Sequence, residues 1–142
     1  MYATLERMQA RFGVRELVQL TDTEEPYTNT INLIKLQAAI DAANSEVNGY
    51  VMSRYGATVQ NPTDFLILLA CDLARYHGAV AGSRVTERDE VRYKAAIKSL
   101  EHIAAGKLSV GTTPQGASPP TTSSNSVVMQ SGRRSDFGKG GF

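Results

Sequence analysis

The side chains most able to carry chemistry in this 142-residue chain lie in or near one apolar run, Phe65 to Cys71. Asp72 follows that run directly. A buried carboxylate is costly unless it is paired, so Asp72 is either a catalytic acid with a shifted pKa or one half of an ion pair. Catalysis needs a second acid, base or nucleophile beside it, whereas an ion pair needs one arginine. We predict a structural ion pair of Asp72 with Arg75, with Arg54 and Arg92 as the other candidate partners.

Neither a metal site nor a cofactor site is predicted. Cys71 stands six residues before His77, which matches no metal-ligand spacing such as CxxC or HExxH, and His102 falls on a different predicted helix. The chain has no Gly-rich strand-to-helix loop, Walker-type lysine or GxSxG elbow. We therefore expect a protein that is not an enzyme and needs no cofactor.

The C-terminal segment 107–142 is rich in Gly, Ser, Thr and Pro and lacks the apolar residues to fold alone. Residues 127–129 are an apolar exception: they either add as a strand to a partner's sheet or form part of a disordered linker. Basic and aromatic residues follow them, which suggests that a partner receives this tail. The predicted partner-binding anchors are Val127, Val128, Met129, Arg133, Arg134, Phe137 and Phe142.

Charge is divided unevenly along the chain. Its formal net charge is +1, but residues 107–142 carry four basic and one acidic side chain, so they hold +3 and the rest holds −2. A duplex-binding domain concentrates basic residues on one face, and the first 106 residues have no such excess. Only the tail is suited to phosphate or to an acidic protein surface.

Five helices are predicted from caps and apolar spacing. The third has apolar residues at steps of three and four, with Leu33, Leu36 and Ile40 expected on its inner face. Tyr50 and Tyr55 near its end are either core residues or interface anchors. The fourth helix is apolar nearly all round and is expected at the centre of the core. The predicted ranges are 4–12, 14–20, 32–55, 62–81 and 86–105.

These elements predict an all-α bundle, residues 1–106, followed by an extended C-terminal tail, residues 107–142. No apolar run approaches the roughly 20 residues that span a bilayer, so we expect a soluble chain without a signal peptide. The single cysteine excludes a disulfide framework within the chain and suggests a reducing compartment.

The order of several motifs resembles the small Mu-like bacteriophage head-tail connector proteins. The most specific stretch is Cys71-Asp72-Leu73-Ala74-Arg75-Tyr76, together with Thr21-Asp22 after the second predicted helix. The start of the chain, Arg54-Tyr55 and the terminal Gly-Phe are also similar, whereas residues 56–60 depart from the family's proline-containing segment.

The resemblance implies a virion neck protein assembled in the bacterial cytoplasm. Copies of it, expected to number twelve from the usual portal symmetry, would form a ring below the portal protein. The ring would also meet the next neck or tail-terminator protein, and genomic DNA would pass through it without specific binding. No membrane is involved.

A second hypothesis from another class is a small helical DNA-binding regulator that uses the basic tail as an arm on DNA. Against it, no predicted helix is rich in the Arg, Asn and Gln residues that read bases.

Overall fold

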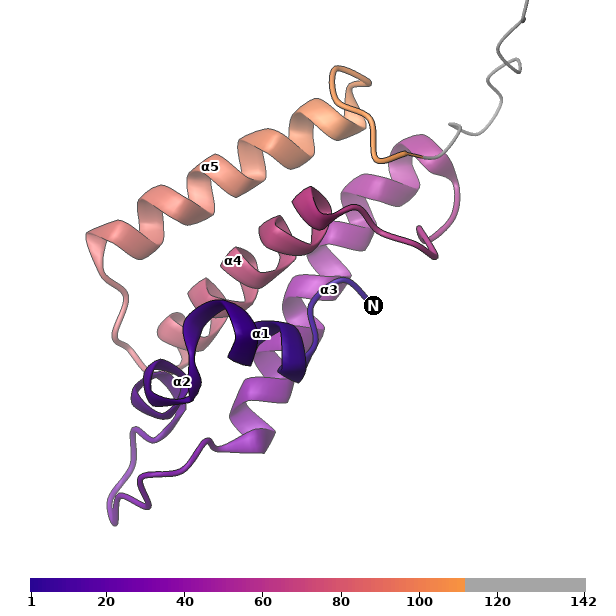
Figure 1. Cartoon of the computed structure of the whole chain (residues 1–142). Coiled ribbons are helices and arrows are strands. Elements are labelled where there is room, and N and C mark those ends of the chain that lie inside the picture. Colours follow the sequence, from indigo (N-terminus) through magenta and orange to yellow (C-terminus); the bar gives the residue numbers. More distant parts are fainter. Residues whose placement is uncertain (112–142) are drawn as a thin grey trace, which may run out of the picture.

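The computed structural model describes residues 1–111, which form five α-helices and, in that range, no strand (Figure 1). The all-α class predicted from the sequence is confirmed. The helix bounds are α1 Leu5–Phe12, α2 Val14–Thr21, α3 Leu33–Tyr55, α4 Asp64–Ala81 and α5 Glu87–Ala104.

Local capping sets most of these bounds. The side chains of Thr4, Asn32 and Thr86 accept backbone N–H groups at the starts of α1, α3 and α5. Gly56 ends α3 in the left-handed region, at φ 71°. The predicted start of α4 at Pro62 was wrong, because the hydroxyl of Thr63 caps this helix by accepting the N–H of Leu66 at 3.3 Å.

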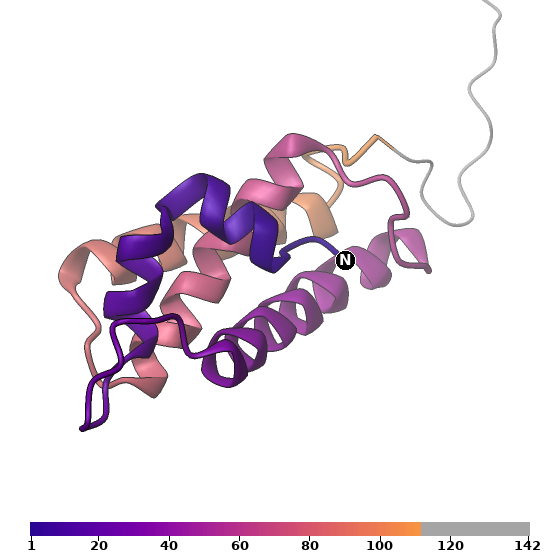
Figure 2. The same cartoon turned by 60° about the horizontal axis from the view of Figure 1, so that its bottom comes forward.

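Helix α4 occupies the centre, as predicted, and contacts each of the other four helices. Figures 1 and 2 show α5 along one side of it, with α1 and α2 crossing the α3–α4 pair on another. Its buried residues include Leu66 and Leu73. Its first turn is only partly covered, however, since Phe65 and Leu68 remain 46% and 37% exposed. The uninterrupted apolar run led us to expect neighbours on every side.

The packed body continues beyond the expected boundary at residue 106. Val110 is buried against the core, and its N–H donates to the hydroxyl of Tyr55 at 3.3 Å. Gly106, at φ 80°, turns the chain back from α5 toward Arg54 and Tyr55. Residues 107–111 therefore fasten the end of α5 to the C-terminal end of α3.

Of the helices in residues 1–111, none combines the length and the apolar character needed to cross a membrane.

Candidate functional site

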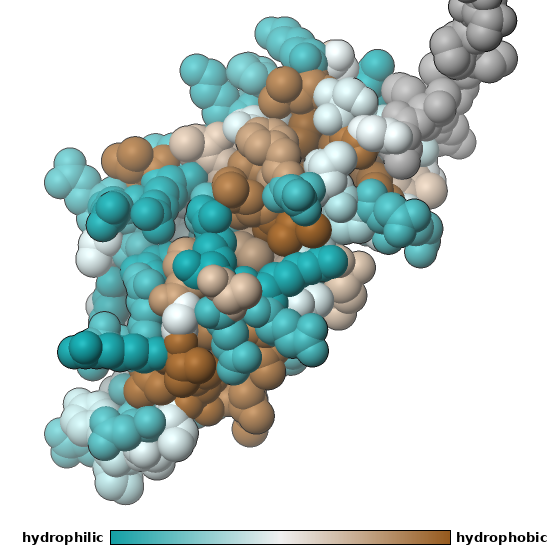
Figure 3. Space-filling view, viewed as in Figure 1, coloured by the Kyte–Doolittle hydropathy of each residue, from teal (hydrophilic) through white to brown (hydrophobic). Residues whose placement is uncertain are grey.

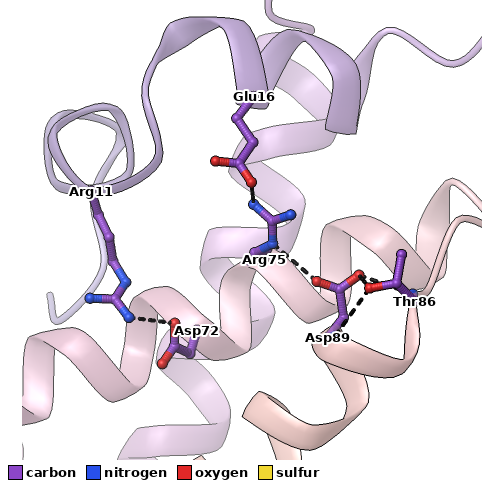
Figure 4. A network of polar contacts seen from close by, with 6 residues as sticks. All are labelled: Arg11, Glu16, Asp72, Arg75, Thr86 and Asp89. Atoms are coloured by element: carbon purple, nitrogen blue, oxygen red, sulfur yellow. Dashed lines mark hydrogen bonds and ion pairs between the residues drawn. The ribbon is translucent and has the colours of Figure 1, made fainter.

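Asp72 forms an ion pair, but the predicted partner was wrong. Its Oδ1 accepts from Nη2 of Arg11 at 2.8 Å (Figure 4). Arg11 comes from α1, which lies across the exposed edge of α4. Arg75, one turn further along α4, points away from Asp72 to other acids. The carboxylate is thus neutralised from a neighbouring helix, which ties α1 to α4.

Arg75 bridges three helices. From α4, its Nη1 pairs with Glu16 of α2, and its Nε donates to Oδ1 of Asp89 of α5 at 3.0 Å (Figure 4). The Asp89 side chain is 6% exposed and that of Arg75 is 20% exposed. Breaking a buried pair leaves an uncompensated charge, so this contact fixes how α2 and α5 sit on α4.

Asp89 also caps its own helix. Its Oδ2 accepts from the N–H and the hydroxyl of Thr86 at 3.0 and 2.8 Å, and the Thr86 hydroxyl accepts the Asp89 N–H. Together these bonds form a capping box at the start of α5. Burial alone would raise the pKa of Asp89, but the hydrogen bonds from Thr86 and Arg75 outweigh it and lower the pKa. The Asp89 carboxylate therefore stays ionised, as expected of a carboxylate in a structural ion pair.

A second polar cluster, which the sequence reasoning missed, joins α3, α4 and α5. Both oxygens of Glu46 are used: Oε2 lies 2.8 Å from Nε2 of His77, and Oε1 accepts from the Tyr93 hydroxyl at 2.9 Å. The Tyr76 ring stacks on Tyr93 with centroids 4.0 Å apart. Burial and the bond to Glu46 raise the pKa of Tyr93 to about 12. The contacts of Glu46 with His77 and Tyr93 hold α3, α4 and α5 together, which suits a structural role.

Cys71 is buried, and burial raises the pKa of its thiol, which keeps it in the weakly nucleophilic protonated form. Within residues 1–111, His, Cys, Asp and Glu side chains form no group of three that could hold a metal ion.

An apolar groove of about 550 Å³ lies beside the first turns of α3. We call it the α3 groove. Leu33 was predicted to face inward, but it is 59% exposed, and Ile34 is 85% exposed. The inner face of α3 begins only at Leu36, which is buried in the core. Figure 3 shows hydrophobic surface gathered at this end of the molecule, over α2 and the start of α3. Residues lining the α3 groove include Leu5, Leu33, Ile34, Gln37, Ala38 and Asp41.

The predicted tail anchors, Val127 to Phe142, lie outside the described residues. Tyr55 is a core residue and Tyr50 is half-buried against the core, so the core interpretation holds for both.

The described residues thus define a small all-α protein whose polar clusters hold its helices together and whose α3 groove leaves apolar side chains exposed. Residues 2–129 match the family model described as Bacteriophage Mu, Gp36, and the chain belongs to this family. A relative from Haemophilus influenzae (strain Rd), the Mu-like prophage FluMu protein gp36, is 25% identical over 131 residues, which cover 92% of this chain and 89% of that protein. The predicted Mu-like phage family is confirmed.

Proposed function

We propose that this phage protein is a structural connector in the virion neck, where it joins the DNA-filled head to the tail. The observation that carries the proposal is its membership of a Mu phage family over residues 2–129. The structure is compatible with an adaptor, because Arg11 and Arg75 form ion pairs that hold helices together.

In this proposal the protein is not an enzyme. Copies of it form a ring, twelve if they match the usual portal symmetry, between the portal protein and the next neck or tail-terminator protein. A contact between two different surfaces, repeated about an axis, closes into such a ring. The charge of −2 on residues 1–106 would let DNA pass through the ring without being held.

The test is a stop codon in the gene for this chain, in the phage or prophage that encodes it. We expect lysates that contain separate DNA-filled heads and complete tails, as counted by electron microscopy. Supplying the full chain from a plasmid should restore joined particles. Joined particles without the chain, or heads that never fill with DNA, would contradict a connector role.

The DNA-binding alternative predicts duplex binding that weakens steeply as salt rises. Nothing in residues 1–111 favours it, and a binding titration at low salt with the full chain separates the two hypotheses.

A further inference from the structure

The α3 groove exposes apolar surface that the protein's own helices leave uncovered. Leu33 and Ile34 stand side by side in the first turn of α3, and Leu5 of α1 forms part of the opposite lining. Two large aliphatic residues at 59% and 85% exposure on one helical turn are more than isolated surface residues. An apolar hollow of this kind, rimmed by polar groups, is typical of a docking site.

We propose that the α3 groove binds residues 127–129 from the C-terminal tail of a second copy of this chain. The inference rests on the proposed ring and names one of its contacts. Val127, Val128 and Met129 are three consecutive large apolar residues in a segment that is otherwise polar. They would bury their side chains against Leu33 and Ile34, with the affinity coming mainly from apolar area removed from water.

Charge complementarity supports this occupant. Asp41 lines the groove, and the exposed Glu6 follows the groove residue Leu5 in α1. Exposed Glu25 lies in the loop that leads into α3. Lys35, in the first turn of α3, is already engaged, since its Nζ lies 2.7 Å from Glu24 and also donates to Thr23. The Oδ1 of Asp41 accepts from the neutral amide of Gln37 at 2.8 Å, so Asp41 offers the groove a negative charge.

The tail supplies the matching positive charge. Arg133 and Arg134 follow Met129 by four and five residues, which places them about 13–17 Å further along an extended chain. With the apolar triplet in the groove, these guanidinium groups fall within reach of the acidic rim. The α3 groove is thus the place where the positively charged tail would contact the negatively charged body.

The tail is long enough to reach the groove of a second copy. The described chain ends at Gly111, next to the C-terminal end of α3, whereas the groove lies at the N-terminal end of that helix. The 23 residues of α3 separate these ends by about 33 Å. The 16 chain steps from Gly111 to Val127 span up to roughly 50 Å. This exceeds the separation of the two ends, so the tail is long enough to reach its own groove as well as a neighbour's. Donor and acceptor surfaces are different, as a ring contact requires.

Disulfide trapping between two single-cysteine additions tests the contact with the full chain. The variants Ile34→Cys and Val128→Cys are purified separately, mixed and oxidised, so that a bond between them forms only between copies. The native Cys71 is buried and does not compete. The matched control replaces Ile34→Cys by Val91→Cys, which is 61% exposed on α5 and lies outside the groove.

We expect the groove pair to give at least about tenfold more heterodimer than the control pair, because docking raises the local thiol concentration. Equal yields from the two pairs would overturn the proposal. So would a tail that bonds only to its own groove, revealed when the double variant forms the bond within one chain and the mixed single variants form none.

The particle counts from the stop-codon test remain an independent measurement. Joined heads and tails that need the chain but show no groove trapping would reject the docking site and keep the connector role. Efficient trapping with no effect of the chain on joining would reject the connector role and keep the docking site.

Discussion

At the residue scale, the polar side chains of the two clusters chiefly hold neighbouring helices together. Arg75 is one example, because it reaches Glu16 and Asp89 on two other helices. A guanidinium suits this position, since its several N–H groups serve two carboxylates at once. The pairs differ in exposure, and therefore in what their loss should cost.

The variant Arg75→Met keeps the aliphatic stem and removes the charge. It should lower the free energy of unfolding by about 2–4 kcal/mol, because Asp89 stays buried without its cation. Urea denaturation followed by circular dichroism measures the change. In the control Lys35→Met, the pair lost with Glu24 has side chains 31% and 80% exposed, so the loss should stay below about 1 kcal/mol. Equal losses of unfolding free energy in the two variants would show that the Arg75 ion pairs contribute no more to stability than the exposed Lys35 pair.

At the element scale, two glycines have opposite effects on the helices. Gly49 lies inside α3 with nothing within 4 Å of the place where a Cβ would sit. It weakens the helix without serving a close contact. Gly106 ends α5 at φ 80°, and a Cβ there would lie 2.6 Å from the Arg54 guanidinium carbon.

Alanine substitution should therefore change stability in opposite directions. Gly49→Ala should raise the free energy of unfolding by about 0.5–1 kcal/mol through better helix propensity. Gly106→Ala should lower it by about 1–2 kcal/mol, because an L residue is strained in the left-handed region. Thermal melts of both variants beside the parent protein provide the measurement, and two shifts of the same sign would contradict this account of the framework.

At the scale of the whole molecule, the folded body and the tail meet after residue 106, not at it. Val110 fills a place in the core beside Tyr55, so the first residues that the composition assigns to the tail are structural. Beyond Gly111, the sequence carries the residues that the proposed ring would use as anchors.

Two truncations should locate this boundary. A chain of residues 1–111 should unfold with nearly the same free energy as the full chain. A chain of residues 1–106 should lose about 2 kcal/mol, since it exposes the pocket left by Val110 and frees the Tyr55 hydroxyl. Urea midpoints of the three proteins give the comparison. If residues 1–106 were as stable as residues 1–111, Val110 would not belong to the body.

The sequence by itself determined the helices, because the signals for them are local. The Thr86 capping box, the stop at Gly56 and the periodic apolar residues act within a few residues of chain. The resemblance of motifs also led to the phage family. Even so, the predicted start of α4 at Pro62 was wrong. Asn61, which precedes it, is also a residue type that caps helices, but Thr63 caps this one.

Only the tertiary structure decided which residues of different helices contact each other and which stay exposed. Asp72 pairs with Arg11, 61 residues away, and not with its near neighbour Arg75, because the path of α1 across α4 sets that distance. Leu33 continues an inward-facing pattern but lies exposed, since no element covers the first turn of α3. Periodicity says which residues share a face of a helix. Whether that face meets another helix, and so becomes core or the α3 groove, depends on how the whole chain packs.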